Sequence, residues 1–315
     1  MRAAVIRAGQ LQVEDRPTPS PAGAEVLVRV AAAGVNRADL LQVKGMHAAP
    51  PGWPTDIPGI EFAGTVTAVG PRVQALSEGD RVFGILGGGG HATELITVED
   101  LCVRVPDSVD LLEAGGIPEV FITAHDALVT RAGLGSGERV LIHAVGSGVG
   151  TAAVQIARAL GASSVGTSRT AGKLDRAVEL GLDEAVLAGD DMEERIGEVD
   201  VVLDLVGGDY LRVDTAVCRP QGRIVLVGLL AGASVDFDLG TVLRKRLQLT
   251  GTVLRARPEW QKAQATAAFA REVVPLFEKG IFKTVIDRVM PLDDIPAAYG
   301  LLAENKTFGK VIISM

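Results

Sequence analysis

Cysteine is nearly absent from this chain of 315 residues, which contains only Cys102 and Cys218. The two lie far apart and outside any C-x-x-C spacing, so the sequence supports neither a disulfide framework nor a structural zinc lobe. We expect both to be buried thiols.

Long apolar runs are missing as well. The amino-terminal stretch returns to charge at Arg7 before a signal-peptide core could form, and no later run is long enough to cross a bilayer. We therefore expect a cytoplasmic protein with no membrane partner. A G-x-S-x-G motif is also absent, which disfavours a serine hydrolase.

Basic residues are fewer than acidic ones: the chain has 31 Lys and Arg against 39 Asp and Glu, which gives a formal net charge of −8. A phosphate backbone would repel such a chain, so we expect no nucleic-acid partner. Apolar residues make up 47% and glycine is abundant at 38 residues. This composition is typical of a soluble α/β protein.

Strand and helix patterns divide the chain into three segments, and its length favours two domains. Residues 1–118 show short strand-like runs broken by prolines, which indicates an irregular β-rich domain. Strands and helices alternate over 119–254, which predicts a parallel, doubly wound Rossmann sheet. Residues 255–315 show one long helix over about 259–279 and two strands, too little for a core of their own. The α/β fold we expect is a Rossmann domain inserted into a split β-rich domain.

A glycine- and serine-rich turn over 145–150 is the most informative segment. It follows the β-branched run 139–142 and precedes a helix with apolar residues at helical spacing. Small residues there let a backbone approach a pyrophosphate, and the N–H groups at the helix start favour its charge. A strict G-x-G-x-x-G register beginning at Val145 has only Gly150 in place, so an ordinary tight turn is the alternative.

The next predicted strand, 163–167, lacks the acidic residue that would hold a ribose 2′-hydroxyl. It runs instead into Ser168, Arg169 and Lys173, which offer a hydroxyl and positive charge to a 2′-phosphate. This pattern favours NADP(H) over NAD(H). The alternative is that Arg169 and Lys173 belong to a solvated loop and first helical turn.

Short segments along nearly the whole chain resemble the zinc-independent quinone oxidoreductases of the medium-chain dehydrogenase/reductase superfamily. The branch most similar to it is the tumour-suppressor-induced quinone oxidoreductases, whose phosphate turn also carries serine. The segments that carry the resemblance are Asn36-Arg-Ala-Asp-Leu40, Pro58-Gly-Ile-Glu61 with Gly64, Gly79-Asp-Arg-Val82, Ile117-Pro-Glu119 with Thr123-Ala124, Leu141-Ile-His-Ala144 with Val149-Gly-Thr-Ala152, Gly207-Gly208, Pro220-Gln-Gly-Arg223, and Asn305-Lys306 with Gly309-Lys310.

The resemblance implies a GroES-like catalytic domain, a Rossmann domain, NADPH in the cleft between them, and homodimers paired through the edge of the Rossmann sheet. The predicted strand over 247–254 is the candidate edge. The site residues it implies are Asn36 and Thr123 near the nicotinamide, Ser147, Gly148, Val149 and Gly150 at the pyrophosphate, Ser168, Arg169 and Lys173 at the 2′-phosphate, and Gly228, Leu229, Val253, Leu254, Arg255 and Asn305 around the rest of the cofactor. Asn36 has the alternative of capping a helix near Arg37, and Thr123 that of an ordinary helix hydroxyl.

We expect no metal. Zinc-dependent relatives surround the metal with Cys, His and a further Cys or acid, whereas here 36–39 and Gly59-Ile60-Glu61 stand in those places. The four histidines, His47, His91, His125 and His143, are scattered at no ligand spacing.

Two residues depart from the pattern of this branch. His47 stands where a tyrosine follows Gly-Gln in the substrate loop, and a histidine there could polarise a carbonyl or relay a proton. A lone exposed loop histidine is the alternative. Ala188 replaces a second tyrosine near the 2′-phosphate, which weakens the preference for NADP(H).

The sequence therefore predicts an NADPH-dependent reductase of quinones or related activated carbonyl compounds, with the cofactor supplying the hydride. Two alternatives stay open. One is an enone or enoyl reductase on the same scaffold, and the other is a non-catalytic NADPH-binding protein.

Overall fold

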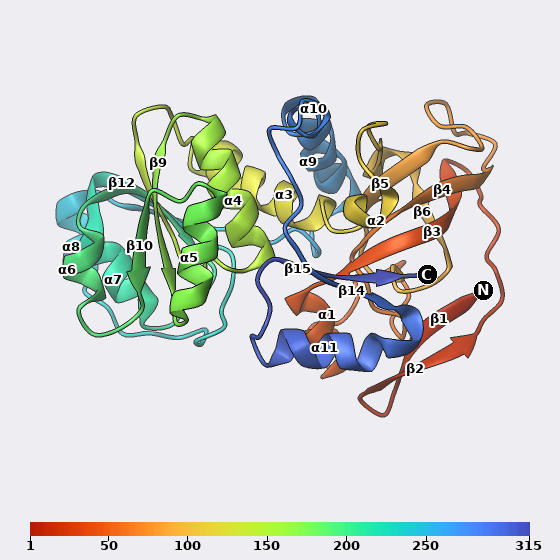
Figure 1. Ribbon diagram of the computed structural model, residues 1–315, viewed down its shortest axis with the longest axis horizontal. Coiled ribbons are helices and arrows are strands. Elements are labelled where there is room, and N and C mark those ends of the chain that lie inside the picture. Colours follow the sequence, from red (N-terminus) through yellow and green to blue (C-terminus); the bar gives the residue numbers. More distant parts are fainter. The chain divides into compact units, whose positions relative to one another are not determined.

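The computed structural model describes all residues 1–315, and they form two compact units (Figure 1). Unit 1 comprises Met1–Ile122 and Leu254–Met315, and unit 2 comprises Thr123–Val253. The predicted divisions are at 118/119 and 254/255. The first observed division falls inside helix α3 (Pro118–His125), which has no break in its backbone to mark it.

Unit 1 contains a two-stranded sheet, β1-β2, and a seven-stranded sheet in the order β14-β15-β3-β4-β5-β7, with β6 also paired to β3. Only β14 and β15 run parallel, and β15 returns from the chain end to pair antiparallel with β3. The strands are β1 (Arg2–Arg7), β2 (Gln10–Asp15), β3 (Glu25–Val35), β4 (Glu61–Val69), β5 (Arg81–Ile85), β6 (Glu94–Val98), β7 (Cys102–Arg104), β14 (Ile286–Pro291) and β15 (Lys310–Ser314).

The core of this sheet follows the two-residue period of its strands. Val26, Val28 and Val30 of β3 point to one face, where they pack with Phe62 of β4. At the other end of β3, Val35 packs with residues of α11 and β15. The helices of the unit are α1 (Arg37–Val43), η1 (Glu99–Leu101), α2 (Leu111–Ala114), α9 (Glu259–Glu272), α10 (Val274–Glu278), η3 (Leu292–Asp294) and α11 (Ile295–Ala303).

The prediction of a single long helix over about 259–279 is wrong, because the chain forms two helices there. α9 ends at Glu272 and α10 begins at Val274. Pro275 has no N–H to donate back along the helix, and its ring clashes with the preceding turn. A proline inside an amphipathic pattern thus ends one helix and starts the next.

Unit 2 is a six-stranded sheet in the order β10-β9-β8-β11-β12-β13, and every neighbouring pair is parallel. The chain moves outward from β8 to β10 and then returns to β11 on the other side, which is the doubly wound Rossmann order. The predicted fold class is confirmed. The strands are β8 (Arg139–Ile142), β9 (Ser163–Ser168), β10 (Glu184–Leu187), β11 (Val199–Asp204), β12 (Cys218–Leu226) and β13 (Gln248–Gly251).

The central strands of unit 2 are buried on both faces. Val140, Leu141 and Ile142 of β8 are consecutive and all fully buried, as a parallel strand covered by helices requires. Figure 1 shows α4 and α5 drawn beside β9 and β10. The helices are α4 (Gly148–Ala159), α5 (Ala171–Leu180), α6 (Met192–Ile196), α7 (Tyr210–Val217), α8 (Leu239–Lys245) and a π-helix (Asp126–Arg131).

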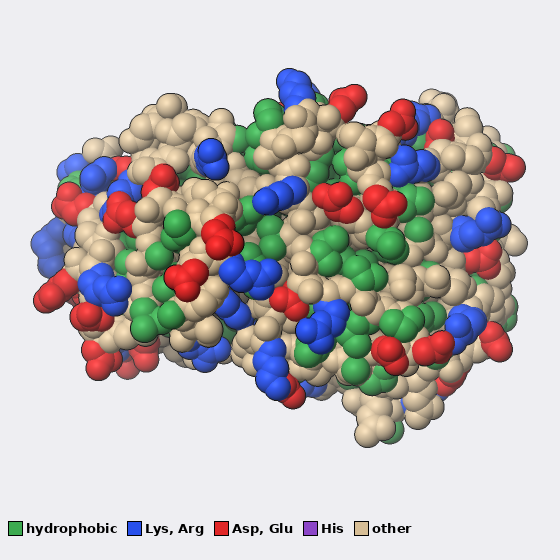
Figure 2. Space-filling model, viewed as in Figure 1, with side chains coloured by type: hydrophobic (Ala, Val, Ile, Leu, Met, Phe, Trp, Pro, Cys, Tyr) green, Lys and Arg blue, Asp and Glu red, His purple; other side chains and the backbone are tan.

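Charged side chains of both signs are interspersed over the face drawn in Figure 2, with no extended patch of one sign. None of the helices combines the length and the apolar composition that crossing a bilayer requires.

Candidate functional site

The turn between β8 and α4 has the predicted strand, turn and helix. Ser147 is the N-cap of α4, and its Oγ accepts the N–H of Gly150 at 3.0 Å. A Cβ on Gly150 would lie 2.6 Å from the carbonyl oxygen of Val145, so only glycine lets the helix begin so close to the strand end. This is the packing role of the last glycine in a dinucleotide fingerprint.

The same turn presents donors for an anion. Gly148 and Val149 are the first residues of α4, where N–H groups have no acceptor within the helix. The turn lies where β8 is flanked by β9 and β11, the point at which strand order reverses. Ligands of open α/β sheets bind at this switch point, beyond the carboxyl ends of the strands.

The ends of three neighbouring strands are hydrogen-bonded to one another at this edge. His143 donates its N–H to Leu203 of β11, and Val227 donates to Asp204. Gly228 follows directly, and a Cβ there would lie 2.4 Å from the carbonyl oxygen of Leu205. The structure therefore brings Gly228 and the exposed Leu229 to the edge that carries the Ser147 turn.

The end of β9 carries the residues predicted for a 2′-phosphate. Val145 donates its N–H to the carbonyl oxygen of Thr167 at 3.0 Å, which places the end of β9 beside the turn that precedes α4. Ser168 is buried and its Oγ accepts the N–H of Thr170 at 3.1 Å, whereas Arg169 is exposed. Lys173 is half-buried in the first turn of α5.

Tyr210 is a member of this neighbourhood that the sequence analysis missed. It begins α7, and its ring meets that of His143 edge to face at 4.7 Å between centroids. Burial raises the pKa of its hydroxyl, and the charge of Arg169 acts in the opposite direction. Its position directly after Gly207-Gly208-Asp209 is the only signal the sequence offers.

A buried polar network under the turn was also missed. His143 is fully buried between Thr167 Oγ1, at 2.7 Å from Nδ1, and Asp214 Oδ1, at 2.8 Å from Nε2. Burial raises the pKa of Asp214 to about 6, although His143 opposes the shift. Such a network fixes the orientation of His143, two residues before the turn over 145–150.

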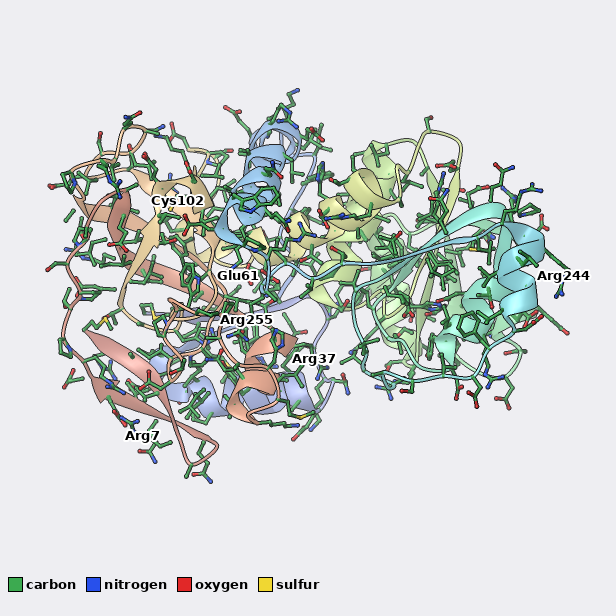
Figure 3. All side chains as sticks on the ribbon, turned by 180° about the vertical axis from the view of Figure 1, so that it is seen from behind. Arg7, Arg37, Glu61, Cys102, Arg244 and Arg255 are labelled. Carbon is green, nitrogen blue, oxygen red and sulfur yellow. The ribbon has the colours of Figure 1, made fainter.

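Unit 1 has a buried ion pair between Glu61 of β4, which is labelled in Figure 3, and Lys310 of β15. Lys310 Nζ lies 2.6 Å from Glu61 Oε1 and 2.7 Å from Asn36 Oδ1, while Asn36 Nδ2 donates to Glu61 Oε1 at 2.8 Å. The side chain of Asn36 thus joins strands that are distant in sequence. A Cβ on Gly34 would lie 2.2 Å from Glu61 Oε1, so glycine is required beside the pair.

Two further acidic residues, Asp39 and Glu119, lie near this pair. Asp39 is buried and accepts the N–H groups of Asn36 and Gly59 at 2.8 and 3.0 Å, and burial raises its pKa to about 6. Glu119 donates its backbone N–H to Glu61 Oε2 at 2.9 Å. Burial, and then the charge of Glu61, raise the pKa of the Glu119 carboxyl to about 8. Glu119 is therefore protonated at neutral pH. The sequence analysis placed it in the segment Ile117-Pro-Glu119 but gave it no role.

Arg255 holds the loop that contains His47. Its guanidinium donates to the carbonyl oxygens of Gly87 at 2.9 Å and His47 at 3.1 Å, and to Gln42 Oε1. Arg255 and Leu254 are buried, and all of these contacts lie within unit 1. His47 itself is half-buried, and burial lowers its pKa.

The remaining predicted residues lie in both units. Asn305 follows α11 with φ of 55°, the left-handed backbone typical of a helix end, and its Oδ1 accepts from Arg37. Thr123 is buried in α3, and Val253 is exposed at the end of unit 2. Unit 1 thus carries Asn36, His47, Leu254, Arg255 and Asn305, and unit 2 carries Thr123, Ser147, Gly148, Val149, Gly150, Ser168, Arg169, Lys173, Gly228, Leu229 and Val253.

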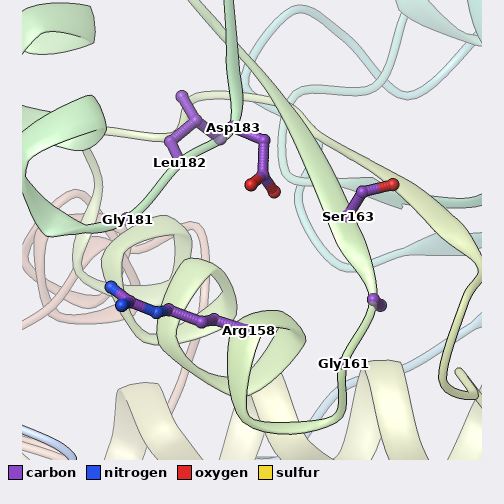
Figure 4. A pocket seen from close by; sticks show the side chains of 7 residues that line it. Arg158, Gly161, Ser163, Gly181, Leu182 and Asp183 are labelled. Atoms are coloured by element: carbon purple, nitrogen blue, oxygen red, sulfur yellow. The ribbon is translucent and has the colours of Figure 1, made fainter.

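A hollow of about 490 Å³ in unit 2 lies away from this edge (Figure 4). It is lined by Arg158, Ser163 and Asp183 among others, and Ser163 begins β9 whereas Ser168 ends it. The hollow therefore lies at the amino ends of the strands. Across the chain, no three His, Cys, Asp or Glu side chains are grouped so that they could hold a metal ion.

Comparison with known proteins decides the family. A family model described as "Alcohol dehydrogenase GroES-like domain" matches residues 22–107, and one described as "Zinc-binding dehydrogenase" matches residues 148–269. Quinone oxidoreductase-like protein 2 of Bos taurus is 30% identical over 312 residues, covering 96% of this chain and 89% of that protein. The chain belongs to the quinone oxidoreductase-like family of the medium-chain dehydrogenase/reductase superfamily. It is accordingly an oxidoreductase that uses a nicotinamide cofactor.

Proteins with other names are also similar to this chain. The spectinabilin polyketide synthase system protein NorB of Streptomyces orinoci is 36% identical over 300 residues, which cover 92% of this chain and 13% of NorB. The chain therefore spans only a small part of this relative. The crystal structure of CurK enoyl reductase has a TM-score of 0.87 and 29% identity, covering 100% of this chain and 99% of that one.

Proposed function

We propose that this chain is an NADPH-dependent oxidoreductase that passes a hydride to quinones or related activated carbonyl compounds without zinc. The observation that carries the proposal is the end of β9, where Ser168, Arg169 and Lys173 stand in place of a ribose-binding acid beside the phosphate turn. The similarity to quinone oxidoreductase-like protein 2 supports the acceptor class.

The residues present fit a dinucleotide with a 2′-phosphate. The turn Ser147–Gly150 would hold the pyrophosphate with helix-start N–H groups, and Arg169 with Lys173 would pair with the 2′-phosphate. When bound, the nicotinamide supplies a hydride from its C4 atom.

Independence of zinc is supported by what surrounds Glu61. Its Oε1 accepts hydrogen bonds from Lys310 Nζ and Asn36 Nδ2, and its Oε2 accepts one from the backbone N–H of Glu119. A carboxylate held in this way by an internal ammonium lacks the free lone pairs and the thiolate neighbours that a catalytic zinc site needs. The part of the chain matched by the "Zinc-binding dehydrogenase" model, residues 148–269, does not include Glu61.

Unit 1 offers two groups for the proton that follows hydride addition. His47 is half-buried and its pKa is lowered, which favours the neutral imidazole, the form that can accept a proton. Glu119 holds its proton at neutral pH and can donate it. A quinone needs little such help, whereas an enone or enoyl carbon does.

Enoyl or enone reduction is the second candidate function, favoured by the similarity to CurK enoyl reductase and to NorB. Steady-state NADPH oxidation with quinones, α,β-unsaturated ketones and enoyl thioesters separates the two. We expect turnover with quinones that survives dialysis against a chelator. Turnover confined to thioesters would contradict quinone reduction and support enoyl reduction. Tight NADPH binding with no acceptor reduced would indicate a non-catalytic NADPH-binding protein.

We also propose a homodimer formed through the edge of the Rossmann sheet. β13 is paired only with β12, so its other side presents unpaired backbone groups. Exposed large apolar side chains lie on the preceding helix and on the strand itself, namely Leu239, Leu243 and Leu249. Apolar surface next to a free strand edge is typical of a subunit interface.

A further inference from the structure

Unit 1 contains a cavity of about 270 Å³ that the cofactor and the catalytic proposal leave unused. Its walls combine prolines and an indole ring with cationic side chains. The lining residues are Pro50, Pro51, Trp53, Ala256, Arg257, Pro258, Glu259 and Lys262.

Lys262 is the unusual member of this lining. The residue is 2% exposed, and its Nζ lies 5.3 Å from the centre of the Trp53 ring. Its ammonium makes no ion pair and no hydrogen bond within the protein. Glu119, the acid that acts on it most strongly, is itself protonated at neutral pH. A buried ammonium with only a cation–π contact is costly, which points to a partner supplied from outside.

The start of α9 adds to the positive character of the cavity. Pro258 is the N-cap of this 14-residue helix, and Lys262 lies at the end of its first turn. Unpaired N–H groups and the helix dipole favour an anion at such an end. Glu259 also lines the cavity and its charge acts on Lys262, but its side chain is exposed, so solvent screens that charge.

The cavity adjoins the loop that carries the catalytic candidate His47. Pro50, Pro51 and Trp53 follow His47 in that loop, and Trp53 packs against Gly87, where a Cβ would lie 2.4 Å from the indole. Arg255, next to Ala256 of the lining, holds the carbonyl groups of both His47 and Gly87. A group seated on Trp53 therefore lies beside the loop that carries His47.

We propose that this cavity binds an oxyanion carried by the electron acceptor, with Lys262 as its charge partner and Trp53 as its flat wall. The proposal rests on the proposed reductase function and narrows its substrates to acceptors with an anionic group. That group is either a carboxylate on the acceptor itself or a phosphate on a thioester carrier.

Binding can be measured without any reaction. Trp53 and Trp260 are the two tryptophans, and Trp260 is exposed, so Trp260→Phe leaves Trp53 as the sole tryptophan, which can be excited selectively at 295 nm or longer. In this background benzoate should quench Trp53 fluorescence saturably, and neutral benzamide should bind at least about tenfold more weakly. Lys262→Met should weaken benzoate at least tenfold, whereas the matched variant Lys279→Met, at an exposed lysine, should not change it. Equal binding of benzoate and benzamide, or equal benzoate affinity in both variants, would overturn the proposal.

A pH titration keeps the test decisive if Lys262→Met does not fold. Burial lowers the pKa of Lys262, so benzoate affinity should fall as the pH rises through that lowered value. Affinity that stays constant up to pH 11 contradicts a lysine partner.

Kinetics identify the source of the oxyanion. Lys262→Met should raise KM for a carboxylated quinone or for crotonyl-coenzyme A about tenfold, and leave kcat unchanged. The neutral partners, menadione and crotonyl-N-acetylcysteamine, should be unaffected. An equal rise in KM for the neutral partners defeats the proposal. If no acceptor is reduced but benzoate binding depends on Lys262, the reductase function fails while the anion site stands.

Discussion

Individual side chains in this protein act through partners that the sequence does not reveal. The family resemblance predicts that Asn36 lies near the nicotinamide, and helix capping is the alternative. Asn36 is indeed the N-cap of α1, and Asp39 accepts its backbone N–H, but its amide also bridges Glu61 and Lys310. Both the β4 and β15 partners lie far along the chain, so only the folded sheet brings them to Asn36.

The 2′-phosphate assignment makes a prediction for Arg169. Arg169→Ala should raise the Kd for NADPH by at least tenfold and leave the Kd for NADH nearly unchanged, because only NADPH carries the phosphate. Isothermal titration of both cofactors measures this. Arg176→Ala, farther along α5, serves as the control, and equal weakening of both cofactors by Arg169→Ala contradicts the assignment.

The buried ion pair of unit 1 makes a prediction for stability. Lys310→Met leaves Glu61 charged and without its cation, which should cost about 3–5 kcal/mol in the free energy of unfolding. Lys306→Met, at an exposed lysine, should change it by about 0.5 kcal/mol or less. Urea denaturation measures the free energy of unfolding of both variants. Equal decreases for Lys310→Met and Lys306→Met would contradict a stabilising role of the buried pair.

The raised pKa of Glu119 leads to a prediction of how the free energy of unfolding depends on pH. Its pKa is about 8 in the folded chain and 4.5 ordinarily, so the folded state holds the proton more tightly. The contribution of this proton is complete below about pH 4.5 and is lost as the pH rises through 8. Glu119→Gln keeps a neutral group at all pH values. It should therefore gain stability relative to wild type between pH 6 and 9, and a constant difference across that range would contradict the shift.

At the scale of elements, the strongly patterned segments were predicted and the interrupted ones were not. The alternation over 119–254 predicted the Rossmann strands because the central ones, β8 and β11, are short, β-branched and buried on both faces. β2, β6 and β7 were not predicted, since they are short and partly exposed. The predicted strand over 247–254 is only four residues long, Gln248–Gly251, because pairing with β12 ends at Gly251.

The free edge of β13 predicts how the chain assembles. Leu243 is 79% exposed on α8, and an acidic residue there would place charge in the proposed interface. Leu243→Glu should therefore shift the protein from dimer to monomer in sedimentation equilibrium, with little change in the far-ultraviolet circular dichroism. Leu112→Glu, at an exposed leucine of unit 1, should leave the dimer intact. A wild type that sediments as a monomer ends the proposal.

At the scale of the whole molecule, unit 1 is made of two pieces of chain that only meet in the folded state. β15 lies between β14 and β3, so its backbone groups are paired on both sides. Removing residues 306–315 exposes both neighbours and removes Lys310. We expect this truncation to abolish the cooperative unfolding of unit 1, measured by calorimetry, while removal of Met315 alone does not. A truncated chain with an unchanged transition would contradict this account.

The sequence by itself determined the doubly wound sheet, the glycine- and serine-rich turn before α4 and the acid-free end of β9. Each depends on residues that are close in the chain, where periodicity and turn chemistry act directly. Only the tertiary structure decided the rest: the Asn36–Glu61–Lys310 cluster, the protonated Glu119, the network around His143, and Lys262 beneath Trp53. Those groups owe their charge and contacts to burial among distant segments, and burial of this kind leaves no local pattern in a sequence.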